Sequence, residues 1–151
     1  MILTMENNAH FNQKIFIVDD DMMTAALYEQ SLLNLGYTDV STFRDAPSAL
    51  NQLTQEPNII LLDQNMEEMS GLVALKKIKR FDPNAYVVFV SGQDDIATAV
   101  TSLKHGAFDY IVKGDGDIDS IEQVLQKIKN VQEMLQRNKG GLVRRVLSIL
   151  V

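Results

Sequence analysis

Short apolar runs alternate along this chain with longer segments in which apolar residues recur every three or four positions. Four runs cover residues 14–18, 58–62, 85–90 and 109–112, and a weaker one surrounds Val40 and Thr42. Because these runs are short and have almost no polar alternation, they predict strands, most of them buried on both faces.

The segments between the runs predict helices. We expect five of them, marked by apolar residues within 28–35, 49–53, 72–78 and 96–103 and from 121 onward. Asp45 is an expected N-cap of the second helix, and Gly36 and Gly106 are expected helix ends. Strands and helices that alternate in this way predict an α/β fold, a doubly wound five-stranded parallel sheet with helices on both faces.

The length of 151 residues suits one domain with tails. We expect a flexible leader over 1–13, a domain over 14–138, and a C-terminal extension, or the start of a linker or output region, over 139–151. The last helix has apolar residues at heptad spacing that continue beyond Gln132, where the sheet is no longer expected to cover them. Met134 and Leu135 are therefore candidates for contacting a partner or a second copy.

Composition and charge exclude several classes of function. The net charge of −6 disfavours direct nucleic-acid binding by this domain, which would need a basic face. The absence of cysteine excludes disulfides, thiolate zinc sites and cysteine nucleophiles. The sequence shows neither a signal peptide nor an apolar run long enough to span a membrane. We therefore expect a cytoplasmic protein without membrane contact.

Polar residues with chemical potential follow directly after the predicted strands. They are Asp19, Asp20, Asp63, Ser91 and Lys113. Taken singly, a strand-end Asp or Ser is as well explained by a capping role. Because the carboxyl ends of parallel strands meet at one edge of a sheet, these residues should lie together. Clustered carboxylates fit Mg²⁺, and the lysine and serine remain as donors for an anion.

The motifs at these positions resemble those of a known family. An apolar strand precedes DD, a second precedes D-x-x-M-x-x-M-x-G, a third precedes S-G, and a fourth contains Y-x-V-K. This order resembles the receiver domain of two-component response regulators over about residues 14–136. The resemblance implies a flavodoxin-like strand order of 2-1-3-4-5.

The resemblance also implies roles in phosphoryl transfer. Asp63 would be the phosphoacceptor that forms an aspartyl phosphate. Asp19, Asp20, Asp63 and the backbone carbonyl of Asn65 would hold Mg²⁺. Lys113 would pair with a phosphoryl oxygen.

A switch and its partners follow from the same resemblance. Ser91 would move toward the phosphoryl group, and Tyr110 would turn inward with it. The phosphoryl donor would be a histidine kinase or a phosphotransfer protein. Phosphorylation would change partner binding at the fourth helix, fifth strand and fifth helix, with a homodimer there or through the C-terminal helix as an alternative. Apart from its own phosphorylation and slow dephosphorylation, the domain would be no enzyme.

Two departures from the family pattern keep other functions open. Glu67 and Gly114 stand where the family usually has proline. Because a cis bond without proline costs about 2.5–4 kcal/mol, we expect a trans Lys113–Gly114 peptide. One alternative is a binding module that is no longer phosphorylated. The other is a Mg²⁺-dependent phosphohydrolase with an Asp nucleophile, although that family's D-x-D motif reads Asp-Gln-Asn here.

The acidic loop after Lys113 is no calcium site of the EF-hand type. Ser120 stands where that loop requires Gly, and Gln126 where it requires Glu. We expect Asp117 or Asp119 to cap the last helix instead.

Overall fold

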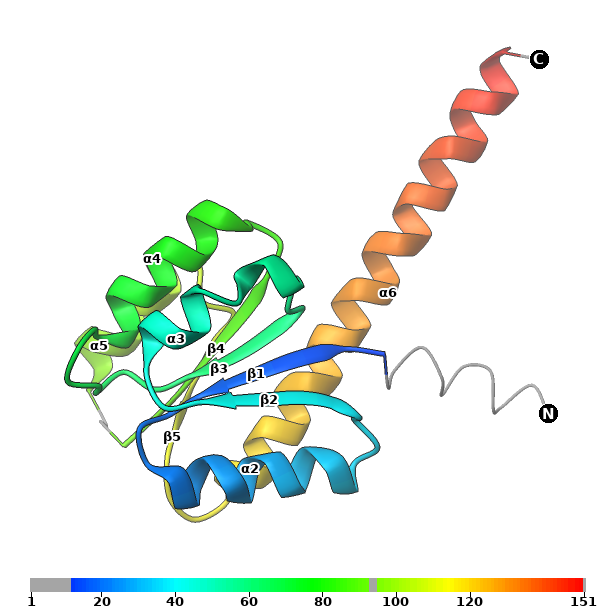
Figure 1. The fold of residues 1–151 in the computed structure, drawn as a ribbon. Helices are drawn as coiled ribbons and strands as arrows, with labels where there is room; N and C mark the ends of the chain where they lie inside the picture. The colour runs from blue at the N-terminus through cyan, green and yellow to red at the C-terminus, as the bar shows by residue number, and fades with distance from the viewer. Residues whose placement is uncertain (1–11, 93–94, 151) are drawn as a thin grey trace. The chain divides into compact units, whose positions relative to one another are not determined.

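The computed structural model describes the backbone of residues 12–92 and 95–150 and the side chains of 12–92, 95–139, 148 and 149. The sheet contains β1 (Lys14–Val18), β2 (Asp39–Phe43), β3 (Ile59–Leu62), β4 (Tyr86–Ser91) and β5 (Asp109–Val112). All neighbouring strands pair in parallel, in the order β2-β1-β3-β4-β5 (Figure 1). This confirms the predicted fold class and strand order.

The helices are α2 (Met22–Asn34), α3 (Ala46–Leu50), α4 (Gly71–Phe81), α5 (Ile96–Lys104) and α6 (Asp117–Leu150), with a 3₁₀ turn, η1 (Leu53–Gln55). Helices α3, α4 and α5 lie on one face of the sheet and α2 on the other (Figure 1). The expected second helix was wrong in its extent, because α3 ends before Leu53. Glu56 has a left-handed φ of 60° and Pro57 follows it, so the chain turns toward β3 rather than continuing as a helix.

The three central strands form the middle of the core. Phe16, Ile60 and Phe89 have no exposed surface, and they belong to a cluster that includes Leu75 and Ile78 of α4. Strand β2 at the sheet edge is only partly buried, which explains its weaker apolar pattern. Burial on both faces therefore fixes β1, β3 and β4 in register.

The register brings the carboxyl ends of the strands to one edge. Asp63 N donates to Val18 O at 2.9 Å, directly beyond the end of the β1–β3 pairing. Lys113 N donates to Ser91 O at 2.8 Å at the corresponding place on β4 and β5. The residues that follow the strands are thus held by the ladder itself.

Acidic residues cap three of the helices that start near this edge, and Ser70 caps α4. Asp21 accepts from two backbone amides at the start of α2, and Asp45 caps α3 as predicted. The N-cap of α5 is Asp95. Ser91, for which a capping role was an alternative, is instead the last residue of β4.

Helix α6 continues through the glycine pair at 140–141, so the pair does not end the helix. The part of α6 from Asp119 onward is a compact unit distinct from the unit that holds the sheet. Along it, Val124 and Ile128 are buried, whereas Met134 and Leu135 are exposed. The division at residue 139 stays a prediction. Of the described helices, none has the length and apolarity needed to cross a membrane.

Candidate functional site

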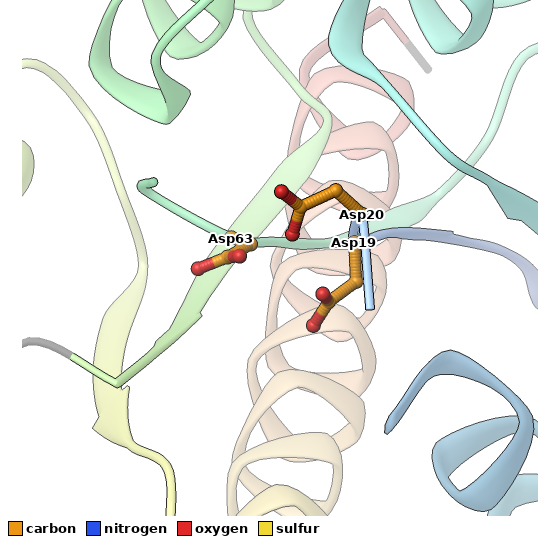
Figure 2. Close-up of side chains that lie close together, drawn as sticks. All are labelled: Asp19, Asp20 and Asp63. Carbon is orange, nitrogen blue, oxygen red and sulfur yellow. The ribbon is translucent and has the colours of Figure 1, made fainter. Parts of the chain in front are cut away.

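Three carboxylates meet at the carboxyl edge of the sheet. Oxygen atoms of Asp19, Asp20 and Asp63 all lie within 4.8 Å of one another (Figure 2). Asp19 and Asp63 are buried and Asp20 is exposed. The group therefore opens toward solvent on the Asp20 side, where an ion or ligand can enter.

Lys113 joins the carboxylates from the loop after β5. Its Nζ lies 2.7 Å from Asp19 Oδ2 and 3.5 Å from Asp63 Oδ2. The Lys113 side chain as a whole is 21% exposed. The predicted convergence of residues that lie far apart in the sequence is thus confirmed as geometry.

The electrostatics of the site leave negative charge uncompensated. Burial raises the pKa of Asp63 above its ordinary value; Lys113 opposes this and Asp19 adds to it. Burial by itself lowers the pKa of Lys113, but its hydrogen bond to Asp19 and the nearby charges outweigh that effect and raise the pKa. Three carboxylates with one ammonium therefore favour a further cation.

The donor set fits a hard divalent cation such as Mg²⁺. Asp19 Oδ2 pairs with Lys113, and Asp19 Oδ1 accepts from Asp21 N at 2.9 Å, so both of its oxygens have partners. Asp63 has only longer contacts, 3.5 Å to Lys113 Nζ and 3.5 Å to Asn65 N, and Asp20 is exposed, so these two residues are better placed for direct ligation. Mg²⁺ needs only one or two carboxylates and retains water at its other positions.

The loop after Asp63 is held by a residue whose role sequence reasoning missed. Gln64 O accepts from Gly71 N, and Gln64 Oε1 accepts from Leu72 N, both at 2.9 Å. Gln64 thus binds the first two amides of α4 and closes the loop that begins at Asp63. Asn65 N lies 3.5 Å from Asp63 Oδ1 at the exposed turn of this loop. No spacing in the sequence signals the contact of Gln64.

Ser91 and Tyr110 occupy the neighbouring strands β4 and β5. Ser91 is fully buried at the end of its strand. Tyr110 is half-buried, and its ring stacks on Phe89 with the centroids 5.8 Å apart. Both residues belong to the same half of the sheet as Lys113.

The loop after Lys113 is built without proline. The Lys113–Gly114 peptide is trans, as predicted, and Gly114 has a φ of +140°. Neither Asp117 nor Asp119 is the predicted cap, because α6 already begins at Asp117. The Asp117 carboxylate instead accepts from Tyr28 and from Gly114 N.

Comparison with curated proteins finds relatives of this chain among transcriptional regulators. The chain is 34% identical over 119 residues to the transcriptional regulatory protein ZraR of Escherichia coli. The aligned segment covers 78% of this chain and 26% of ZraR. The chain thus spans about a quarter of the length of such curated relatives.

Solved structures show the same fold. A CheY-like receiver domain protein from Methanospirillum hungatei has a TM-score of 0.73 at 28% identity, over 81% of this chain and 98% of that one. A CheY from Borrelia burgdorferi, in a complex described as CheX-CheY-BeF3-Mg+2, has a TM-score of 0.70 at 26% identity, over 76% of this chain and 87% of that one.

The family model of the response regulator receiver domain matches residues 15–136, which include all of the sheet except Lys14 and every residue of the acidic site. The chain therefore belongs to the response regulator receiver domain family.

Proposed function

We propose that this chain is a phosphorylation-dependent signalling switch in which Asp63 accepts a phosphoryl group from a histidine kinase or a phosphotransfer protein. The observation that carries this proposal is the position of Asp63, buried at the end of β3 beside Asp19, Asp20 and Lys113. A carboxylate in this place is shielded from bulk water, yet it lies beside the exposed carboxylate of Asp20.

In the proposed transfer, an oxygen of Asp63 attacks phosphorus, and the bond from phosphorus to the donor breaks. Lys113, now 3.5 Å from Asp63, would pair with a phosphoryl oxygen. Asp20 and Asp63, with Asp19 and the backbone carbonyl of Asn65, would hold Mg²⁺. When bound, the ion neutralises charge on the carboxylates and on the phosphoryl oxygens.

The switch would act through Ser91 and Tyr110. Ser91 would donate a hydrogen bond to the phosphoryl group, and Tyr110 would follow it inward. The surface of α5 and β5 supports a partner site there, because it carries exposed apolar side chains: Ile96, Val100, Leu103 and Val112.

The output of the switch is proposed to reside in other protein segments or partners. The curated relatives are regulators about three times as long as this chain, among them a DNA-binding transcriptional regulator, NtrC. With its net charge of −6, this chain is proposed to act in the cytoplasm without binding nucleic acid itself. The exposed Met134 and Leu135 support a secondary proposal of a homodimer through the C-terminal helix.

The test is phosphoryl uptake by the purified chain. With Mg²⁺ and acetyl phosphate, intact mass should show one added phosphoryl group. Asp63→Asn should abolish this gain, whereas Asp119→Asn, an exposed acidic control, should keep it. Mg²⁺ at tenfold its dissociation constant should stabilise the folded state by about 1.4 kcal/mol.

The other outcomes separate the two alternatives. Continuous turnover of many small phosphate esters would indicate a phosphohydrolase. If the chain neither takes up a phosphoryl group nor binds beryllofluoride, it is a binding module, and the proposal is overturned.

A further inference from the structure

The loop that carries Lys113 has little packing of its own. Gly114 and Gly116 both have positive φ values, +140° and +81°. A Cβ placed at either glycine would meet nothing within 4 Å. Because glycine has the greatest backbone freedom of any residue, such a loop does not hold its own conformation. Lys113 itself is held by Ser91 O and by its ion pairs, so contacts from outside the loop must fix the backbone that follows it.

Asp117 makes the contacts that fix this loop. Gly114 N donates to Asp117 Oδ2 at 3.3 Å, and Asp117 N donates to Gly114 O at 3.2 Å. Both polar backbone groups of Gly114 are therefore tied to one residue. Gly114 is the immediate neighbour of Lys113, so the ties act directly on the backbone that carries the ammonium.

Tyr28 anchors Asp117 to the rest of the domain. Its hydroxyl donates to Asp117 Oδ2 at 2.6 Å, across 89 residues of sequence. The tyrosine is only 2% exposed, so its ring is held by packing. It lies on α2, which begins at Met22, directly after the acidic residues 19–21. The anchor therefore belongs to the same segment as two of the three site carboxylates.

The charge state of this pair is suited to the contact. Burial and the hydrogen bond to Asp117 raise the pKa of Tyr28 far above its ordinary value. The hydroxyl thus keeps its proton and acts as a donor to the carboxylate at every physiological pH.

We propose that Tyr28 and Asp117 are positioning residues that hold the backbone at Gly114 so that Lys113 is directed at the group bound on Asp63. This rests on the proposed function, because it assumes that Lys113 contacts a phosphoryl oxygen. The hydrogen bonds from Tyr28 to Asp117 and between Asp117 and Gly114 take the place of a proline after the lysine and hold the loop rigid.

The experiment compares beryllofluoride affinity with Mg²⁺ affinity in the full chain. Tyr28→Phe removes the hydrogen bond that anchors Asp117, and Asp117→Ala removes both side-chain contacts of Asp117. Asp117→Asn keeps an acceptor oxygen, and Asp115→Ala is a matched control on an exposed residue of the same loop. Loss of one hydrogen bond predicts about fivefold weaker beryllofluoride binding and slower phosphorylation by acetyl phosphate. Asp117→Asn and Asp115→Ala should retain most of the wild-type affinity.

Mg²⁺ affinity separates positioning from general damage. The ion would contact the carboxylates and not Lys113, so its affinity should stay within about twofold in every variant. Wild-type beryllofluoride affinity in Tyr28→Phe would overturn the inference. A parallel loss of Mg²⁺ affinity and thermal stability would overturn it too, by showing a purely structural role. Failure of the wild type itself to bind beryllofluoride would overturn the proposed function instead, and the role of Lys113 with it.

Discussion

Replacing Gly71 by alanine should have two effects: it should destabilise the domain, and it should displace Asp63. Gly71 is the first residue of α4, and its backbone conformation is open to any residue. An added Cβ would clash most closely with the carbonyl oxygen of Asp63, and would lie 2.7 Å from Phe89 Cε1 and 2.9 Å from Gln64 Cα. Two of these three atoms belong to the backbone, so a change of side-chain rotamer cannot relieve the contact.

The magnitude follows from two opposing effects. Overpacking in a filled site costs about 1–3 kcal/mol. Alanine favours a helix interior over glycine by about 1 kcal/mol, and by less at the first residue of a helix. We therefore expect a net loss of about 1–2 kcal/mol in the free energy of unfolding. For a domain of this size that corresponds to a fall in Tm of about 4–8 °C.

Urea unfolding followed by circular dichroism measures this loss, since the chain has no tryptophan. The matched control is Gly92→Ala, where the added Cβ meets nothing within 4 Å and stability should stay level or rise by up to about 1 kcal/mol. Gly71→Ala should also slow phosphoryl uptake, because the loop must move away with Asp63. If Gly71→Ala has wild-type stability and wild-type phosphoryl uptake, the contact between residue 71 and Asp63 does leave room for a Cβ, and the prediction is wrong.

Two further predictions concern charge and capping. Without metal, Asp63→Asn should be more stable than the wild type at neutral pH, since the pKa of Asp63 is raised and the folded state binds its proton more tightly. The difference in free energy of unfolding between the variant and the wild type should shrink as the pH falls from the raised pKa of Asp63 toward the ordinary pKa of an aspartate. Urea titrations with EDTA at several pH values measure this difference, and a constant difference would contradict the prediction. Asp45→Ala should cost about 1 kcal/mol, because Asp45 accepts from Ser48 N at 2.7 Å at the start of α3. Its phosphoryl uptake should remain normal, and an unchanged urea midpoint would count against the cap.

The sequence alone determined the sheet and the composition of its functional edge. Strands buried on both faces have uninterrupted apolar runs such as residues 59–62, and these runs can be recognised in the sequence alone. Parallel strands align their carboxyl ends, so Asp63 and Lys113 could be placed together although 50 residues separate them. The trans peptide after Lys113 was predictable too, because it depends only on the cost of a local bond.

Only the tertiary structure decided how the loops around that edge are held. Three sets of contacts hold them: Tyr28 with Asp117, Gln64 with the first amides of α4, and Gly71 with Asp63. A single contact of this kind leaves no periodic pattern in a sequence, unlike a buried strand or an amphipathic helix. The sequence thus identified the charged residues of the site, and tertiary contacts determined how the loops that carry them are held.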